Sequence, residues 1–256
     1  MAGQTTATRP SAPSKRGRLP IGAVLALTLI AFASGSVSAQ ERDSAIAQFE
    51  HLEYTITWPS GLPVGKAEFR ARDLDPGWRL EMTLRASLPQ IEIDDAFVSW
   101  TDAGMCSRAF EKHVRHGAKR VHESLRFADG ELERSNMEAP GRGPPGRTPI
   151  GECARDALAH LYFLRRDLAA GRIPPPSDVY FGAGYRVRME FVRTRWLTIG
   201  GARQLADEIR TVVRGPASEH AFTVYFGRDS AHTLLLVRAD FEEGPFSMQL
   251  AEEGDE

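Results

Sequence analysis

Apolar and polar residues alternate one by one through much of the first half of the chain, as expected for strands with one buried and one solvated face. The pattern is clearest at residues 52–58, 66–72 and 78–87. The turn signal Asp75-Pro76-Gly77 separates the last two segments. These three segments predict an antiparallel meander with one wet face.

Weaker alternation predicts more strands at 97–102, 107–115, 119–127 and 131–137. We expect His116-Gly117 to form the tip of one hairpin, and Asp129-Gly130 is a dipeptide of the hairpin type. In the second half, strands are predicted at 185–191, 222–226, 233–241 and 246–250. Residues 203–214 fit both a helical stripe and a strand face, and we favour a strand.

Residues 138–150 are rich in proline, glycine and arginine, and they predict a loop without regular structure. The loop includes Gly141-x-Gly143-x-x-Gly146, which formally matches the dinucleotide-binding pattern. That pattern needs a preceding strand and a helix N-terminus at its third glycine, whereas Pro144 and Pro145 stand in its variable positions. We therefore interpret the segment as a loop.

The stretch 152–170 predicts the one clear helix, because its leucines recur at helical spacing and Gly171 stands at its end. A single helix among strands is either a lid packed on a sheet or a connector that covers one face. We expect the apolar positions of the meander and of this helix to face a ligand or a core. They are Tyr54, Ile56, Trp58, Phe69, Trp78, Leu80, Met82, Leu84, Leu161 and Tyr162.

The N-terminal segment has the three parts of a secretory signal peptide. Lys15, Arg16 and Arg18 precede an apolar run at 21–32, and Val37-Ser38-Ala39 resembles a cleavage site. The run is too short to remain across a bilayer core of roughly 30 Å. The prediction is a signal peptide at 1–39, cleaved near Ala39, and a periplasmic β-rich domain at 40–256 that spans no membrane.

Removal of residues 1–39 takes away four basic residues and no acid, so the formal net charge changes from −2 to −6. A mildly acidic exported chain that ends in an acidic tail at 252–256 is a poor candidate for binding nucleic acid. The two cysteines, Cys106 and Cys153, both follow the cleavage site. In an oxidising compartment we expect them to form one disulfide.

Several segments together resemble a family of exported bacterial proteins catalogued as domain of unknown function 3108. The strongest similarity is the helix 156–165, which resembles the pattern D-x-L-S-A-x-Y-x-x-R. The opening Phe49-x-x-Leu52-x-Tyr54, the core Phe110-Glu111-Lys112 and the closing segment 246–250 are also similar. The resemblance implies an exported, mainly β protein of the bacterial envelope, and it identifies no catalytic residue.

Glu111, His113 and His122 form the most suggestive polar cluster, because two histidines and a carboxylate can bind zinc. A two-residue turn at His116-Gly117 would place Glu111 opposite His122 and His113 opposite Arg120. The surrounding basic residues oppose cation binding, so we expect a solvated hairpin face, with no metal and no cofactor. A second basic cluster, Arg186, Arg188, Arg193 and Arg195, is either a wet strand face or a site for an anionic polymer.

No Gly-x-Ser-x-Gly elbow and no serine with a recognisable base is present, so nucleophilic catalysis lacks support. The sequence favours a curved antiparallel sheet or open barrel around one helix that acts as a non-enzymatic periplasmic carrier of a lipid or other apolar ligand. The alternatives are an envelope scaffold that binds another protein and a glycan-active enzyme. Because fold does not establish function, these alternatives stay open.

Overall fold

The computed structural model describes residues 46–251, apart from residues 90, 139–145, 217 and 242–243. The chain forms two units, Met1–Arg42 and Asp43–Glu256, and the described residues belong to the second. The predicted signal peptide with its cleavage site and the acidic tail at 252–256 lie outside the described residues.

The described residues form one sheet of fifteen strands and one helix. The strands are β1 (Phe49–Thr57), β2 (Pro63–Asp73), β3 (Gly77–Leu88), β4 (Ile91–Asp102), β5 (Ser107–His116), β6 (Lys119–Ala128), β7 (Glu131–Asn136), β8 (Gly146–Pro149), β9 (Arg155–Asp156), β10 (Ser177–Tyr180), β11 (Gly184–Ile199), β12 (Ala202–Arg214), β13 (Glu219–Gly227), β14 (Leu234–Phe241) and β15 (Gly244–Leu250). The helix is α1 (Ala157–Ala169). The favoured strand at 203–214 is present as β12.

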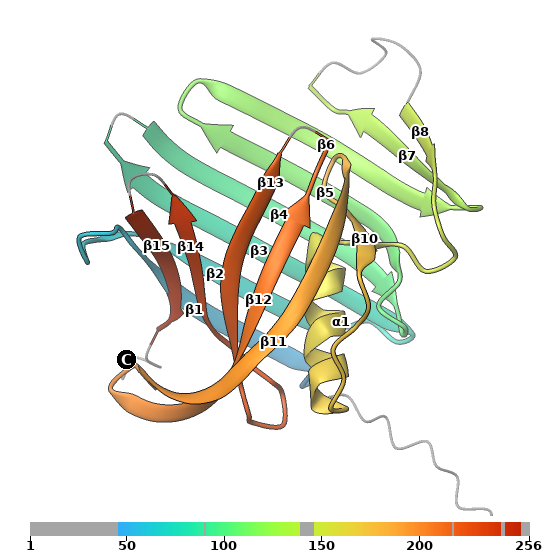
Figure 1. The fold of residues 1–256 in the computed structure, drawn as a ribbon. Coiled ribbons are helices and arrows are strands. Elements are labelled where there is room, and N and C mark those ends of the chain that lie inside the picture. The colour runs from blue at the N-terminus through green and yellow to red at the C-terminus, as the bar shows by residue number, and fades with distance from the viewer. Residues whose placement is uncertain (1–45, 90, 139–145, 217, 242–243, 252–256) are drawn as a thin grey trace, which may run out of the picture. The chain divides into compact units, whose positions relative to one another are not determined.

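Strand order follows the chain on both sides of β1. Strands β2 to β8 lie on one side of β1, and β15 back to β9 lie on the other, so the last strand pairs with the first. We call β1–β8 the first wing and β9–β15 the second wing. Neighbours are antiparallel except for the parallel pair β9 and β10. The short edge strands β8 and β9 are not joined, and the predicted curved, open, mainly β sheet with one helix is confirmed (Figure 1).

Helix α1 contacts both wings, packing against β3 and β4 of the first and against β9 and β10 of the second (Figure 1). It is shorter than the predicted helix at 152–170. Residues 155 and 156 pair with β10 as a strand, and the side chain of Asp156 caps the helix by accepting from the backbone N–H groups of Leu158 and Ala159. The helix therefore begins five residues later than the leucine spacing alone suggested.

Two predictions about turns and loops are wrong in detail. Residues 146–149 of the predicted loop form β8, because an edge strand tolerates a proline that cannot donate to the ladder. Residues 139–145 of that loop lie outside the described residues. In the β5–β6 hairpin, His116 pairs with Lys119, so the turn residues are Gly117 and Ala118. Gly117 has a φ of +57°, in the left-handed region that glycine enters without strain.

Candidate functional site

A cavity of about 380 Å³ lies between α1 and strands β10 to β13 of the second wing. Its walls are almost entirely apolar. The lining residues are Ala157, His160, Leu161, Leu164, Val179, Phe181, Tyr185, Val187, Met189, Thr211, Val213, Phe222, Val224 and Phe226. Ligand sites are typically concave and apolar, with volumes of about 300–1,000 Å³ and a few placed polar groups.

The helical wall of the cavity follows from the 3.6-residue period. Four residues of α1 line the cavity: Ala157, His160, Leu161 and Leu164. Residues 160 and 161 follow 157 by three and four positions, and residue 164 follows them by four and three, so all four lie on one face of the helix. The cap at Asp156 starts the helix directly before this face. The same element thus presents one histidine in a row of aliphatic residues.

The sheet wall of the cavity follows from the two-residue period of the strands. Val187 and Met189 of β11 pair with Val213 and Thr211 of β12, and Thr211 pairs in turn with Phe222 of β13. Directly paired residues point to the same face of a sheet, so a row across three strands faces the helix. Thr211 is the one hydroxyl-bearing β12 residue in this row.

Two polar atoms in the cavity wall have no hydrogen-bond partner within the described residues: His160 Nε2 and Thr211 Oγ1. Both side chains are buried. Burial, together with the nearby Arg155 guanidinium, lowers the pKa of His160 from 6.5 to about 4. The imidazole is therefore uncharged at neutral pH. The sequence did carry a signal for these two residues, since each is a polar residue within an apolar stripe.

A buried network fixes the N-terminal end of α1. Asp156 is fully buried, and one of its carboxylate oxygens accepts hydrogen bonds from Ser99 (2.5 Å) and Ser107 (2.6 Å). The other accepts from the backbone N–H groups of Leu158 (2.9 Å) and Ala159 (3.0 Å). Desolvation raises the pKa of Asp156, and the four donated hydrogen bonds oppose that rise. The network ties the helix start to β4 and β5.

A second buried network fixes the C-terminal half of α1. The guanidinium of Arg165 donates to both carboxylate oxygens of Glu50, at 2.6 and 2.7 Å, and its Nε donates to the carbonyls of Ala231 and His232. The Tyr162 hydroxyl donates to the same carboxylate at 3.3 Å. Glu50 lies on β1, and residues 231 and 232 precede β14. The helix is thus held against both wings.

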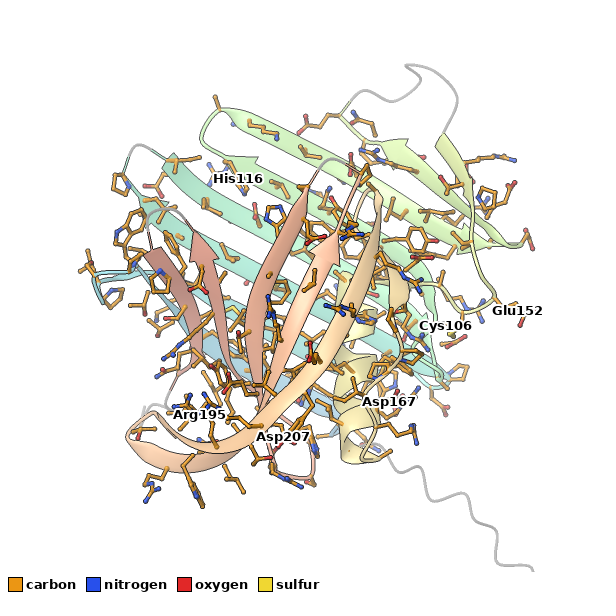
Figure 2. The ribbon with its side chains drawn as sticks, viewed as in Figure 1. Cys106, His116, Glu152, Asp167, Arg195 and Asp207 are labelled. Atoms are coloured by element: carbon orange, nitrogen blue, oxygen red, sulfur yellow. A yellow bond between two sulfur atoms is a disulfide. The ribbon has the colours of Figure 1, made fainter. Side chains whose placement is uncertain are left out.

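Cys106 and Cys153 form a disulfide, as predicted, with their Cα atoms 4.8 Å apart. Beside it, the backbone N–H of Ser107 donates to the carbonyl of Ala154 at 2.9 Å. Figure 2 shows Cys106 and Glu152, the neighbour of Cys153, near one another at the right of the molecule. The bond joins the segment between β4 and β5 to the segment that enters α1.

The apolar residues proposed from the sequence lie mostly away from the cavity. Tyr54, Phe69, Trp78, Leu80 and Tyr162 are buried in the main core, and the Tyr54 hydroxyl donates to the carbonyl of Leu234. The others of the meander are partly buried: Ile56, Met82 and Leu84 pack on that core, and Trp58 contacts the ring of Phe246. Only Leu161 of the ten lines the cavity. Most of the proposed residues are therefore core residues of the first wing, whereas the cavity lies between α1 and the second wing.

The Glu111, His113 and His122 cluster differs from the expected arrangement. His113 pairs with His122, with ring centroids 3.7 Å apart, whereas Glu111 pairs with Ser124. The turn at residues 117 and 118 shifts the register by two residues from the predicted one. Among the described residues, no three metal-ligating side chains lie close enough together to hold an ion.

The arginines of β11 are largely paired with acids on the neighbouring strands. Arg186 contacts Asp178 at 3.2 Å, and Arg193 and Arg195 contact Glu208 at 3.0 and 3.7 Å. Arg195 lies near the tip of the long β11–β12 hairpin (Figure 2). These ion pairs favour a solvent-exposed strand face whose charges are balanced by neighbouring acids over a site for an anionic polymer.

A model of a family described as proteins of unknown function (DUF3108) matches residues 53–251. The chain belongs to this family. The resemblance stated from the sequence is thereby confirmed, and the family has no assigned activity. The helical motif that resembles the family pattern has a structural role in this DUF3108 protein. Asp156 caps the helix, and Tyr162 and Arg165 both contact Glu50.

The chain is similar to several solved structures at low identity. The chain is similar to a β-barrel-like protein of the domain of unknown function DUF1849 from Brucella abortus, with 11% identity, a TM-score of 0.56, and coverage of 78% of this chain and 94% of that one. A candidate exported protein with a YmcC-like fold from Bacteroides fragilis matches at 12% identity and a TM-score of 0.30, covering 79% and 93%. A candidate lipoprotein from Parabacteroides distasonis matches at 8% identity and a TM-score of 0.33, covering 81% and 95%. No curated protein matches.

Within the described residues, no helix has both the length and the apolar character needed to cross a membrane.

Proposed function

We propose that the protein is a periplasmic, non-enzymatic binding or carrier protein for an apolar, lipid-like ligand that occupies the cavity between α1 and β10–β13. The observation that carries the proposal is the cavity itself, about 380 Å³ in volume and lined almost entirely by aliphatic and aromatic side chains. Apolar pockets of this size are typical binding sites for apolar ligands. The hollow over β2 to β5 is polar by contrast, so it is a poorer site for an apolar ligand.

The rigid setting of α1 supports a binding role. Both ends of the helix are tied down, by Asp156 to two serines and by Arg165 to Glu50, so the wall of the cavity is formed before a ligand arrives. Preorganisation of this kind lowers the entropic cost of binding. A loosely held helix would instead close the space by collapsing onto the sheet.

The periplasmic part of the proposal is supported by two independent features. The N-terminal sequence has the basic, apolar and cleavage-site parts of a signal peptide. The disulfide between Cys106 and Cys153 is the pairing expected in an oxidising compartment. N-terminal sequencing of the protein from cells should give a mature end at or near Gln40, and recovery of soluble cytoplasmic protein with Met1 intact would contradict export.

One observation favours a second candidate function, the envelope scaffold. Phe191, Val192 and Trp196 of β11 are about half exposed, and Arg203 lies over the Trp196 ring at 5.1 Å. Exposed aromatic residues with arginine are typical of protein interfaces. On this alternative, a partner protein covers the β11 surface, and the cavity is a packing defect without a ligand.

The third alternative, a glycan-active enzyme, would need carboxylates that converge on a cleft. A polar hollow over β2 to β5 contains Glu92 and Asp94, but Asp94 is bonded to Arg115 at 2.7 Å and Glu92 accepts from Ser87 at 2.7 Å. Paired surface carboxylates of this kind are common charge partners. We therefore retain the non-enzymatic proposal.

The carrier proposal is tested by ligand binding to the purified mature protein. An apolar dye should bind, a phospholipid or fatty alcohol should displace it, and mass spectrometry of natively extracted protein should find co-purified lipid. Val213→Phe, which narrows the cavity, should weaken dye binding. The matched control Val192→Phe, on an exposed position of β11, should leave it unchanged. Absence of both dye binding and lipid would favour the scaffold.

A further inference from the structure

Residues 188–199 of β11 have a strand neighbour on one side only. β10 pairs with β11 from Gly184 to Val187, whereas β12 pairs with β11 as far as Ile199 (Figure 1). Within the described part of the chain, no backbone hydrogen bond joins residues 188–199 to any segment other than β12. The N–H and C=O groups that point away from β12 are therefore open to another strand.

This open edge differs from the two ends of the sheet. β8 at one end has four residues and finishes at Pro149, and β9 at the other end has two. Short strands and prolines at a sheet edge are ways in which proteins avoid edge-to-edge association. Residues 188–199 instead exceed the length of a typical whole strand, about 5–6 residues. The sheet is therefore protected at its ends and open along β11.

The side chains of the open edge divide into an apolar face and a basic face. Phe191 and Trp196 pair with odd-numbered residues of β12, whereas Arg193 and Arg195 pair with even-numbered ones, so the two sets lie on opposite faces. The bulge at Val192 produces this change in the alternation. Phe191 is 48% exposed and Trp196 is 56% exposed. An added strand would meet aromatic rings on one face and guanidinium groups on the other.

The open edge is positively charged within an acidic protein. Residues 188–199 contain three arginines and one glutamate, a net charge of +2, whereas residues 40–256 carry −6. Arg193 and Arg195 share one acid, Glu208, and remain 60% and 42% exposed. One arginine in excess suits a few acidic residues rather than a polyanion. A second copy of β11 would place like charges together, which opposes an edge-to-edge dimer.

We infer that residues 188–199 of β11 bind an extended segment of a partner protein, which adds to the sheet as a further strand and alternates apolar with acidic residues. In strand addition, backbone hydrogen bonds supply the affinity and alternate side chains supply the specificity. A membrane surface is a poorer occupant, because hydrocarbon cannot bond to free backbone groups. The inference names the kind of partner for the second candidate function, and it does not require the cavity to be empty.

The probe is a short, end-blocked, fluorescein-labelled peptide in which valine alternates with glutamate, and its binding to the purified protein is followed by fluorescence anisotropy. Two methylated forms test the mode of binding, one with the valine nitrogens methylated and one with the glutamate nitrogens methylated. Only alternate N–H groups of an added strand face β11, so one form should lose at least about tenfold in affinity and the other should bind like the parent. Equal affinities of the two forms would overturn strand addition. Equal binding of a peptide with lysine in place of glutamate would overturn the acidic partner.

Substitutions in the protein test the two faces of the edge. Phe191→Ala and Trp196→Ala should each weaken binding of the parent peptide about tenfold, because each removes an aromatic contact. Phe49→Ala, at an exposed phenylalanine of β1, is the matched control and should leave binding unchanged. Arg195→Gln should weaken binding about threefold, whereas Arg85→Gln, at an exposed arginine of β3, should not. Unchanged binding in all three β11 variants would overturn the inference.

Hydrogen exchange locates the contact on the chain. When the parent peptide binds, the backbone amides of residues 188–199 should exchange more slowly, whereas those of β8, another exposed edge, should not change. Slower exchange at β8 alone would overturn the inference, and so would the absence of binding up to about 0.1 mM protein. A dimer in light scattering that Trp196→Ala dissociates would also overturn it, in favour of a second copy of the chain. Binding of an apolar dye to the same samples reports separately on the carrier proposal.

Discussion

Arg165 and Glu50 form a buried bidentate ion pair although 115 residues separate them in the chain. The Arg165 side chain is 1% exposed, and its Nε donates to the carbonyls of residues 231 and 232, just before β14. The pair keeps the pKa of Arg165 raised despite its burial, because the carboxylate favours the charged form. It connects the helix with β1, the strand at which the two wings meet.

Glu50→Ala should destabilise the protein by about 3–5 kcal/mol, because it leaves the Arg165 guanidinium buried without its counter-charge. The double variant Glu50→Leu with Arg165→Met should lose less, since no charge is then left unpaired. Urea unfolding followed by circular dichroism measures both. Equal stability of Glu50→Ala and the unmodified protein would show that the pair does not hold the helix.

Asp156→Ala should destabilise the protein by about 2–4 kcal/mol, combining the loss of a helix cap with two buried serine hydroxyls left without an acceptor. The matched control is Asp178→Ala, which removes an exposed carboxylate paired with Arg186 and should change stability by less than about 1 kcal/mol. Thermal unfolding of the two variants side by side gives the comparison. Similar shifts of the unfolding temperature in Asp156→Ala and Asp178→Ala would contradict a special role for the Asp156 cap.

Replacing Cys106 and Cys153 together by alanine should lower the free energy of unfolding by about 4 kcal/mol in the chain-entropy model, because the bond closes a loop with a sequence separation of 47. The measurement is urea unfolding of the oxidised protein and of the double variant. Thiol titration of the unfolded, unreduced protein is the control, and two reactive thiols per chain would show that the bond is absent in solution.

Stability should fall in acid because His160 resists protonation in the folded state. The folded-state pKa is about 4 against 6.5 for the free side chain, so the unfolded state takes up the proton first and stability is lost as the pH falls from 6.5 to 4. The loss amounts to about 3 kcal/mol from this group. Since carboxylates also titrate there, the test is the difference between the protein and His160→Asn across this range. Parallel pH profiles would contradict the prediction.

Local periodicity predicted most of the secondary structure. Alternation at 52–58, 66–72 and 78–87 corresponds to β1, β2 and β3, and the leucine stripe after residue 156 corresponds to α1. Errors occurred where the outcome depended on partners elsewhere in the chain. The helix start was placed too early because the pairing of Arg155 with Val179 is not visible in a local pattern.

The candidate site was predicted less well than the fold. Alternation identified the apolar side chains of the first wing, but it could not show that they are buried in the core while those of the second wing line a cavity. His160 and Thr211 are 51 positions apart and belong to different elements, so nothing local joins them. The sequence ranked Glu111, His113 and His122 above them because metal-type residues are conspicuous in a hairpin.

The sequence by itself determined the alternation that makes the strands and the spacing that makes the helix. It also supplied the two cysteines for one disulfide and the expectation of an export signal. Tertiary structure alone decided which apolar faces meet, where space is left between them, and which polar groups are buried there. The physical reason is the distance along the chain over which each feature is set. Strand and helix periods are set by neighbours within a few residues, whereas burial and register depend on contacts between distant segments. Glu50 and Arg165 show this, since each is an ordinary charged residue until the wings bring them together.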